Sequence, residues 1–364
     1  MKDKFIDITY HQLKARDAKA LKESIPGNFI WMSHCAQNFE WISYKFAFFN
    51  GAFKESNYSV FVSDEAINKI TIPFTLHKRI KDENPAFVLV HGLNNYFQLL
   101  HLRWVLGKHV KILVQHHGEQ PRGILKRGLL KLSALVVDAF LFTSQETARQ
   151  LRIPQRKLFL LMEGSTDFKP KNKTEVRIKL KLPEEELIYI WVGRLIPIKN
   201  PLFLLEEFAV FLKERPSAHL YLMYHDEMLL EECRKLTKGL INVKYLGKVP
   251  HQELNDWFSA ADYFVSASLH EGSGYALCEA MACGCIPIVP SIGAFNFMTG
   301  NGEVGLMYES GKRESLREAL VRSETLNKTE AQKKVLDQFG NHLSFEAIAD
   351  TLFRITGALN KINK

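Results

Sequence analysis

Residues 270–289 read HEGSGYALCEAMACGCIPIV, and this stretch decides the fold. The apolar run at 263–266 before it predicts a strand, residues 275 to about 283 predict a helix, and 286–289 predict a second strand. Two strands joined through a helix pair in parallel by a right-handed crossover. The stretch therefore predicts an α/β protein built on a parallel sheet.

The alternation of strands and helices extends along the whole chain. Further strands are predicted in the first half at residues 29–33, 59–63, 87–91, 112–115, 140–143 and 158–161, and in the second at 187–192, 220–224, 243–246 and 305–307. Several of these runs are apolar at nearly every position, as expected of strands that helices cover on both faces.

A polar segment, STDFKPKNKTEV at residues 165–176, interrupts the alternation and predicts a linker. The length of 364 residues suits two domains. We therefore expect two Rossmann-like doubly wound domains, over 1–165 and 166–343, with the ligand cleft between them. An amphipathic helix over 344–364, with Ser344 at its N-cap, can pack back on the first domain.

The composition is that of a soluble globular protein, with 46% hydrophobic and 24% charged residues, which excludes disordered and disulfide-rich classes. The start, MKDKFIDITYHQ, lacks the apolar core of a secretory signal, and no apolar run reaches the ~20 residues that span a bilayer. The five cysteines show no paired spacing, and Cys283 and Cys285 are expected to be buried core residues rather than a metal pair. A cytoplasmic location is the resulting expectation.

Basic charge is concentrated in the first half of the chain. Residues 1–170 contain 24 lysines and arginines against 15 acidic residues, whereas residues 171–364 contain 24 against 25. This asymmetry indicates an anionic partner or surface, or only a drift in surface composition, and charge alone favours neither.

The loop Gly272-Ser273-Gly274 precedes the predicted helix of the opening stretch. Glycines let backbone N–H groups approach an anion, and the start of a helix adds about half a positive charge, so a phosphate fits there. Glu271 lies in the loop and Glu279 on the helix, where two carboxylates can accept hydrogen bonds from a sugar and a ribose. The alternative is a solvated loop glutamate and a glutamate on the helix surface.

A second informative stretch is WVGRLIPIKNP at residues 191–201. Arg194 and Lys199 follow a predicted strand and can converge on one diphosphate, which arginine can bind with two hydrogen bonds. Without the glycine loop, two surface cations would be the simpler interpretation.

Together the two stretches resemble glycosyltransferase family 4, a retaining family with the GT-B fold. Residues 270–289 are similar to its E-x7-E signature, with Glu271 and Glu279 in the two glutamate places, and VGRLIPIKN is similar to its GR-x4-K motif. EGSTDFKP at 163–170 resembles the interdomain hinge, although Glu163 stands where asparagine is usual. The stretch YLGKVPHQELNDWFSAADYFVSAS is also similar, and the resemblance is good over about residues 158–350.

The resemblance implies a role for each matched residue. Arg194 and Lys199 would neutralise the diphosphate of a UDP- or GDP-linked sugar, Glu271 would bind hydroxyls of the transferred sugar, and Glu279 would bind the ribose. The remaining donor-binding residues would be Gly193, Lys248, Val249, Ser273, Gly274, Tyr275 and Ala276, with 248–249 at the base and 273–276 at the distal phosphate. Without an Asp-x-Asp pair no metal is required, because the two cations can replace it, and no further cofactor is expected.

In the first half, His117 follows a predicted strand and matches the place of a family histidine near the donor sugar. A neutral histidine there could donate to a sugar hydroxyl or orient the acceptor. The glycine-rich loop that the family carries after its first strand is replaced by SHCAQNFEW, and a later G-x-G by Tyr224-His225-Asp226-Glu227. Roles at the first loop cannot be transferred.

Basic residues cluster between 103 and 131: Arg103, Lys108, Lys111, Arg122, Lys126, Arg127 and Lys131. The segment PRGILKRGLLKLSALVV predicts a basic amphipathic helix, which binds either lipid headgroups or the core of its own domain. Arg122, Lys126, Arg127 and Lys131 are therefore the candidate acceptor or membrane surface. No nucleic-acid-binding motif is present.

These patterns predict a retaining, metal-independent hexosyltransferase that acts on a glycan or lipid-linked acceptor, in cell-surface polysaccharide or glycolipid assembly. It would be cytoplasmic, at the inner face of the membrane. A nucleotide-sugar epimerase of the same fold and a catalytically silent sugar-nucleotide-binding protein are the alternatives.

Overall fold

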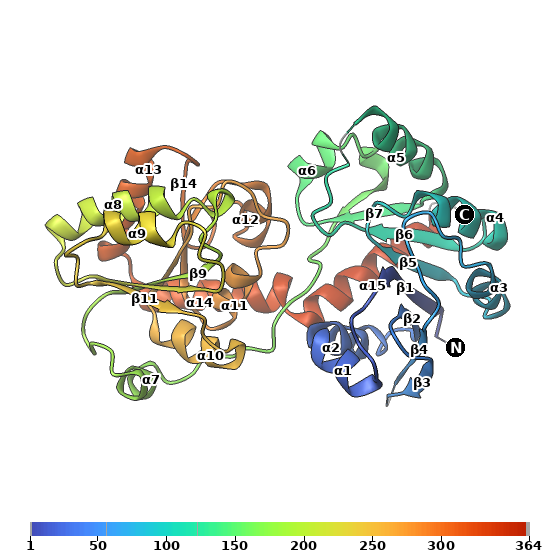
Figure 1. Ribbon diagram of the computed structural model, residues 1–364, viewed down its shortest axis with the longest axis horizontal. Coiled ribbons are helices and arrows are strands. Elements are labelled where there is room, and N and C mark those ends of the chain that lie inside the picture. The colour runs from blue at the N-terminus through green and yellow to red at the C-terminus, as the bar shows by residue number, and fades with distance from the viewer. Residues whose placement is uncertain (1, 56, 122, 362–364) are drawn as a thin grey trace. The chain divides into compact units, whose positions relative to one another are not determined.

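A computed structural model describes residues 2–55, 57–121 and 123–361 (Figure 1). The chain divides into two compact units. Unit 1 runs to Gly164 and also includes the segment from Phe345 onward, and unit 2 is Ser165–Ser344. Among the described residues, none of the helices is both long enough and apolar enough to span a bilayer.

Unit 1 is an α/β layered domain. Its elements are β1 (Lys4–Gln12), α1 (Ala18–Ser24), α2 (Pro26–Cys35), β2 (Glu40–Phe46), β3 (Gly51–Lys54), β4 (Tyr58–Ser63), α3 (Phe74–Asp82), β5 (Phe87–His91), α4 (Tyr96–Leu106), β6 (Lys111–Gln115), α5 (Ile124–Val136), β7 (Ala139–Phe142), α6 (Gln145–Gln150), β8 (Leu158–Leu160) and α15 (Phe345–Lys361).

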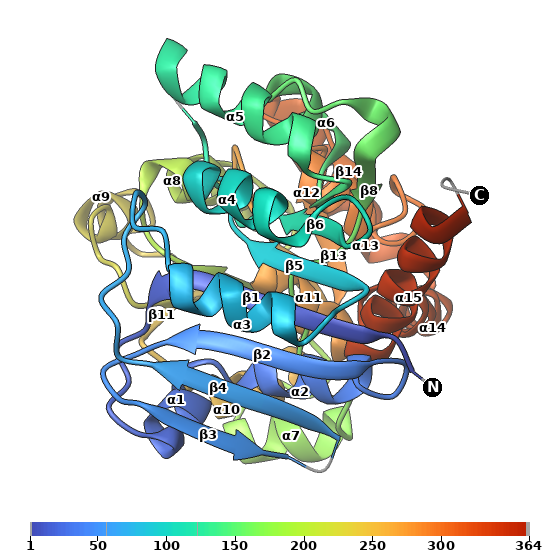
Figure 2. The ribbon, with the colours of Figure 1, turned by 90° about the vertical axis from the view of Figure 1, so that its right-hand side faces the viewer.

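The sheet of unit 1 has the strand order β3-β4-β2-β1-β5-β6-β7-β8. Its pairs are parallel except for β3, which is antiparallel to β4. Figure 2 shows α3 and α4 on one face of these strands and α2 on the other. The strand order reverses between β1 and β5, which is the point where doubly wound sheets bind ligands.

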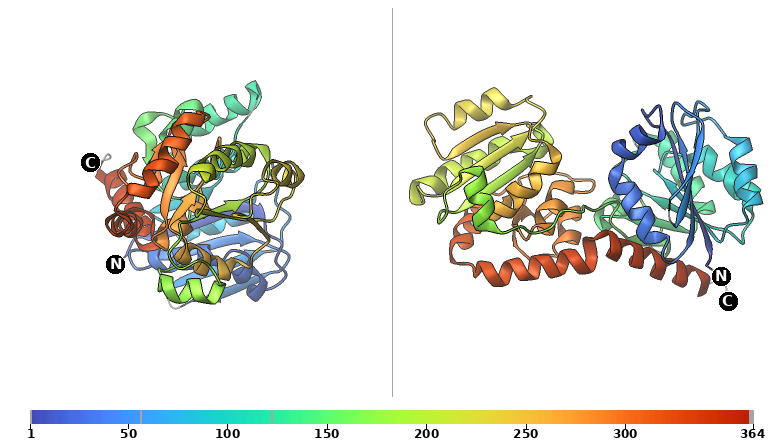
Figure 3. Two further views of the ribbon diagram at one scale, coloured as in Figure 1. Left: turned by 90° about the vertical axis from the view of Figure 1, so that its left-hand side faces the viewer. Right: turned by 90° about the horizontal axis from the view of Figure 1, so that it is seen from below.

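Alternating side chains of β1 pack into two different layers. Ile6 and Ile8 join the buried cluster that includes Ile80 of α3 and Leu99 of α4. On the other face Phe5 stacks on Trp41 with ring centroids 4.4 Å apart. Helix α15 contacts α2 on this face, as the red and dark blue helices in Figure 3 illustrate.

The first predicted strand is wrong, because residues 29–33 lie inside helix α2. Its buried side chains Phe29 and Met32 are three positions apart, a spacing that places them on one face of a helix. Pro26 occupies the first turn, where proline is tolerated. The segment SHCAQNFEW at 33–41 therefore ends a helix and starts β2, and it is not the loop after the first strand. The loop after the first strand of the domain instead follows β1. The sequence analysis did not predict β1, β2 or β3.

Unit 2 is also layered α/β. Its elements are α7 (Lys173–Leu180), β9 (Ile188–Gly193), the 3-10 turn η2 (Pro197–Lys199), α8 (Pro201–Glu214), β10 (His219–Tyr224), α9 (Leu230–Leu236), β11 (Val243–Gly247), α10 (His251–Ala260), β12 (Tyr263–Val265), α11 (Tyr275–Ala282), β13 (Ile286–Pro290), α12 (Gly293–Met298), β14 (Leu306–Tyr308), α13 (Arg313–Thr325), α14 (Lys328–Gln338) and the π-helical turn η3 (Phe339–Leu343).

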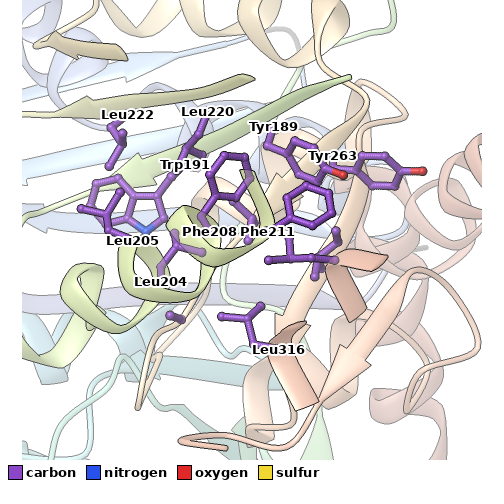
Figure 4. Packing of buried hydrophobic residues seen from close by; sticks show 14 of the residues in the cluster. Tyr189, Trp191, Leu204, Leu205, Phe208, Phe211, Leu220, Leu222, Tyr263 and Leu316 are labelled. Atoms are coloured by element: carbon purple, nitrogen blue, oxygen red, sulfur yellow. The ribbon is translucent and has the colours of Figure 1, made fainter. Parts of the chain in front are cut away.

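The six strands of the sheet described in unit 2 are parallel, in the order β11-β10-β9-β12-β13-β14. This is the Rossmann order, with its reversal between β9 and β12. Aromatic residues of the central strands and of α8 fill the core, where Tyr189, Trp191, Phe208 and Phe211 pack together (Figure 4). Cys283 and Cys285 are buried and free, as expected of core residues.

Candidate functional site

A cavity of about 570 Å³ lies in unit 2 at the carboxyl ends of its parallel strands. Its walls contain every predicted donor-binding or catalytic residue of unit 2 except Glu279: Gly193, Arg194, Lys199, Lys248, Val249, Glu271, Ser273, Gly274, Tyr275 and Ala276. The reversal of strand order between β9 and β12 opens this edge of the sheet, because the connections leave in opposite directions there.

Helix α11 begins at this cavity. Its N-cap, Gly274, has φ of +67°, in the left-handed region that favours glycine. A Cβ at this position would lie 3.0 Å from Phe295 Cε1 and 3.1 Å from Met298 Sδ, so there is no room for a side chain. The backbone at the start of α11 is thereby left open toward the cavity, where the first N–H groups of a helix bind anions.

Lys199 and Glu271 form an ion pair on the cavity wall. Lys199 Nζ lies 2.6 Å from one carboxylate oxygen of Glu271 and 2.7 Å from the other. Their loops are also joined by the backbone, since Leu269 N–H donates to the carbonyl of Ile198 at 2.9 Å. The two side chains are 21% and 12% exposed. Arg194 is exposed beside it.

Glu279 is buried, which makes the alternative of a surface glutamate wrong. It accepts a hydrogen bond at 2.6 Å from Nε2 of His251, the first residue of α10 and part of the cavity wall. This hydrogen bond, together with the charge of Glu279, raises the pKa of His251 although burial opposes it. The sequence analysis did not single out His251, and its only signal was its position after Pro250.

The segment that replaces the second G-x-G also reaches this cavity. Tyr224 and His225 line it, and the carbonyl of Asp226 accepts a hydrogen bond from Leu195 N–H at 3.0 Å. Side chains therefore occupy a wall where the family pattern has glycines, and the loop is tied to the one that carries Arg194.

In unit 1 a chain of polar side chains crosses the carboxyl edge of the sheet. Lys45 Nζ donates to Asp7 Oδ2 at 2.8 Å, and His91 Nε2 lies 2.5 Å from Asp7 Oδ1. His91 Nδ1 lies 2.9 Å from His117 Nε2, and His117 Nδ1 lies 2.8 Å from Glu163 Oε2. We call these five residues the polar chain. Of them, the sequence analysis identified His117 as a candidate and noted Glu163 only as a departure from the family pattern.

The two ends of the polar chain differ in exposure. Asp7 and Lys45 are buried, with side chains at most 1% exposed, whereas one third of the His117 side chain is exposed. Burial raises the pKa of Asp7, but Lys45 and His91 outweigh this effect and hold the pKa well below its usual range. Asp7 is therefore a buried carboxylate.

The two histidines of the polar chain are shifted in opposite directions. Burial lowers the pKa of His91 despite its contact with Asp7. Burial also lowers the pKa of His117, but its hydrogen bond to Glu163 and the negative charge of Glu163 reverse this and raise the pKa. The backbone N–H of His117 donates to Glu119 at 2.8 Å, and the neighbouring His116 packs flat on Phe142.

A second cavity, of about 660 Å³, lies beside the polar chain in unit 1. His91 belongs to both the polar chain and the wall of this cavity, and Glu119, which accepts from the backbone of His117, also lines it. The other polar residues on its walls come from the ends of β1 and β5 and from the loop after β4: Tyr10, His11, Gln12, Asn68, Lys69, Asn94 and Asn95.

Helix α5 presents both apolar and basic side chains to solvent. Ile124 is 93% exposed and Leu135 76% exposed, and Leu125 and Leu132 are also exposed. Lys126, Arg127 and Lys131 are exposed on the same helix, and Arg122 lies outside the described residues. Helix α4, which packs on α5, adds the exposed Trp104. The apolar face of this helix is therefore only partly used by the core.

Two members of the predicted basic cluster do not belong to this surface. Arg103 donates to three backbone carbonyls and to Asp138, so it fixes the end of α4. Lys111 is buried. The exposed part of the basic cluster between residues 103 and 131 is accordingly smaller than the sequence suggested.

The fold is shared with solved glycosyltransferase structures. Sucrose-phosphate synthase of Thermosynechococcus elongatus superposes with a TM-score of 0.71 at 17% identity, covering 99% of this chain and 100% of that one. Anabaena HepE in complex with UDP-glucose gives 0.66 at 14% identity, covering 97% and 99%. The chain thus has the GT-B fold, two Rossmann-like domains, as the resemblance implied.

Sequence comparison places the second unit more narrowly. Residues 186–324 match the family described as Glycosyl transferases group 1. A D-inositol 3-phosphate glycosyltransferase of Thermobispora bispora is 26% identical over 230 residues, 58% of this chain and 53% of that protein. A second, of Streptomyces avermitilis, is 30% identical over 156 residues, 39% and 33% of the two chains. The match spans about half the length of the first relative and a third of the second.

Proposed function

We propose that the protein is a retaining glycosyltransferase that moves a hexose from a UDP- or GDP-linked sugar to an acceptor hydroxyl. The observation that carries the proposal is the cavity of unit 2, where Arg194, Lys199 and the start of α11 surround one space with Glu271. Two cations and a helix N-terminus suit a diphosphate, and a carboxylate suits sugar hydroxyls. The match of residues 186–324 to the group 1 family supports it.

The geometry of the Lys199–Glu271 ion pair determines which part of the donor we propose each residue contacts. Both oxygens of Glu271 touch Lys199, yet each retains a lone pair that can accept from a sugar hydroxyl. Lys199 can in turn donate to a phosphate oxygen through its remaining protons. The pair therefore holds the cation beside the phosphate and the acceptor of hydrogen bonds beside the sugar before the donor arrives, so little reorganisation is needed.

We assign the nucleoside to the other end of the cavity. The backbone of Lys248 and Val249 would meet the base, and Glu279 would accept from the ribose hydroxyls. His251 binds Oε1 of Glu279 and leaves its second oxygen for the ribose. Ser273, Gly274, Tyr275 and Ala276 would bind the distal phosphate through backbone N–H groups, since they surround the start of α11.

Catalysis would rest on stabilising the departing diphosphate. Arg194 and Lys199 supply the two charges that a divalent metal supplies elsewhere, so we propose a metal-independent reaction. The acceptor would attack on the face that the leaving group departs from, and the leaving phosphate oxygen would take the proton of the acceptor hydroxyl. Configuration at the anomeric carbon is then retained.

Unit 1 would bind the acceptor. Its cavity of about 660 Å³ is lined by amide, imidazole and carboxylate groups, which suit a polyhydroxylated molecule. His117 would orient the acceptor, since its two ring nitrogens contact His91 and Glu163. A glycan or lipid-linked acceptor in cell-surface polysaccharide or glycolipid assembly agrees with the net basic charge of residues 1–170.

We further propose that α5 binds the surface of an anionic membrane, which would place the protein at the inner membrane face. The exposed Ile124, Leu125 and Leu135 would enter the headgroup region while Lys126, Arg127 and Lys131 pair with lipid phosphates. Reversing the three charges to glutamate should abolish sedimentation with vesicles of anionic lipid and leave donor binding unchanged. Reversal of the exposed Lys19, Lys78 and Lys81 on α1 and α3 is the matched control. Equal sedimentation of the two variants would contradict the proposal.

The donor assignment is tested by a thermal-shift screen of nucleotide diphospho-sugars, because a ligand raises stability by RT ln(1 + [L]/Kd). We expect a UDP- or GDP-sugar to raise the melting temperature, and Lys199→Ala to remove the rise. Nucleotide release that increases with added acceptor identifies a transferase, whereas release without such an increase would favour an epimerase or a silent binding protein. SHCAQNFEW is not the loop after the first strand, but the loop that does follow β1, residues 13–17, also contains no glycine, so the reason for the silent alternative stands.

A further inference from the structure

The contacts of the polar chain determine how many protons its two histidines carry. At one end His91 Nε2 faces the carboxylate of Asp7, and at the other His117 Nδ1 faces the carboxylate of Glu163. A carboxylate only accepts hydrogen bonds, so each of these ring nitrogens must carry a proton. The central contact joins two ring nitrogens, His91 Nδ1 and His117 Nε2, at 2.9 Å, and a hydrogen bond there requires one more proton.

We propose that the His91–His117 pair holds three protons on its four ring nitrogens, and so presents one fixed positive charge to substrate oxygens at the carboxyl edge of the unit 1 sheet. All three protons are engaged within the polar chain, so the pair would act through its charge rather than as a general base. Glu163 and Asp7 are positioning residues in this arrangement, because they act through the histidines.

The alternative count places the third proton on Glu163. A protonated Glu163 would donate to His117 Nδ1 and leave both imidazoles neutral. Reference pKa values are about 4.3 for glutamate and about 6.5 for histidine. This difference of about two in pKa favours the proton on the imidazole. A low dielectric narrows this gap, but the one-third exposed His117 ring retains part of its solvation.

The charge resides mainly on His117. Asp7 already has the ammonium group of Lys45 at 2.8 Å and the hydroxyl of Ser43 at 2.8 Å, so it needs no second full cation. His91 is the more buried ring, and burial opposes charge. Along the polar chain the charges then alternate: Lys45 positive, Asp7 negative, the histidine pair positive, Glu163 negative.

Other groups near the ring agree with this count. Glu119 accepts from the backbone N–H of His117 and adds negative charge at the same edge. Burial lowers the pKa of His116 and so opposes a positive charge on that neighbouring ring. Lys45 is the cation that opposes the charge, and it is bound to Asp7 on the far side of His91.

Glu163 is the residue that gives this chain its charged histidine. It stands where the resembled family has asparagine, whose amide oxygen can accept from a ring N–H but carries no charge. Glu163→Gln and Glu163→Asn should therefore lower the pKa of His117 by roughly one unit or more, the effect of removing an adjacent opposite charge. Glu146→Gln, an exposed change on α6, is the control.

The protons can be counted directly by NMR of protein labelled with ¹⁵N-histidine, with His117→Gln to assign the signals. We expect both ring nitrogens of His117 to be protonated at neutral pH in the native protein, and one of them to lose its proton at lower pH in Glu163→Gln than in the native protein or Glu146→Gln. A neutral His117 in the native protein near pH 7 would overturn the inference.

The role in the reaction rests on the proposed function and has its own measurement. The rate constant kcat/KM should fall as pH rises through the pKa of His117, and the fall should move to lower pH in Glu163→Gln. A general base would give the opposite slope and overturn the assigned role. A charged His117 in a protein that turns over no nucleotide sugar would contradict the proposed function and leave the proton count standing.

Discussion

The two units assemble their polar residues in opposite ways. In unit 2 the cavity wall draws most of its predicted residues from two short segments, 193–199 and 271–276, each next to a strand end. In unit 1 the polar chain takes one residue from each of five separate segments: Asp7 of β1, Lys45 of β2, His91 of β5, His117 after β6 and Glu163 after β8. The first kind of site is visible as a motif, and the second depends on strand register.

The two sites also differ in how their charges are solvated. Lys199 and Glu271 keep contact with water, whereas Asp7 and Lys45 have none. A buried ion pair that loses one partner leaves an uncompensated charge, while a partly exposed pair does not. The same kind of mutation should therefore affect stability in unit 1 and activity in unit 2.

The largest expected effect is on the stability of unit 1. Lys45→Met leaves the buried carboxylate of Asp7 without its ammonium partner and should lower the free energy of unfolding by about 3–5 kcal/mol. Lys199→Met, the matched change in unit 2, should cost less than about 1 kcal/mol. Urea denaturation measures the loss of stability in each variant, and hydrogen exchange of amides in β1 and β9 assigns it to unit 1 or unit 2. Equal losses in the two variants would contradict the difference between the two sites.

The next effect is on activity. Lys199→Ala and Glu271→Ala should each lower the transfer rate at least ~100-fold, the effect of removing one group that stabilises a transition state. Folding should survive, because the pair is partly exposed. Rates with saturating donor are compared with circular dichroism of each variant. Near-normal activity of either variant would remove that residue from the mechanism.

A smaller effect is expected at the start of α11. Gly274→Ala places a Cβ 3.0 Å from Phe295 in a left-handed backbone, and should destabilise unit 2 by about 1–3 kcal/mol. Gly311→Ala is the control, since it has φ of +78° with nothing within 4 Å of its Cβ. The additional loss of stability in Gly274→Ala relative to Gly311→Ala measures the effect of crowding alone. Equal melting temperatures of the two variants would show that the cavity wall can move.

The smallest effect is pH-dependent. Glu279 raises the pKa of His251, so their ion pair stabilises the folded protein fully below the unfolded pKa of about 6.5, and this stability is lost as pH rises through the folded pKa. His251→Gln should therefore lower the melting temperature at about pH 5 and have no effect at about pH 9, with a difference below about 1 kcal/mol because His251 is largely exposed. A loss of stability that does not depend on pH would indicate that His251 acts through packing rather than through its ion pair with Glu279.

Two of the three strands that the sequence analysis missed, β1 and β2, carry residues of the polar chain. Buried polar residues interrupt the apolar pattern of β1 at Asp7 and of β2 at Ser43 and Lys45, so neither segment resembled a covered strand. The apolar run 29–33 was assigned as a strand because short apolar runs do not distinguish a strand from a buried helix. Some of the polar residues that concealed β1 and β2 from the sequence analysis are therefore members of the polar chain.

The sequence by itself predicted the parallel α/β architecture and most of the residues that line the cavity of unit 2, because each depends on spacing within a short segment. Only the tertiary structure decided that Glu279 pairs with His251, that Lys199 and Glu271 pair with each other, and that five distant residues form the polar chain. These contacts join residues 26 to 84 positions apart along the chain. Their partners are set by strand register and sheet order, which no local pattern encodes.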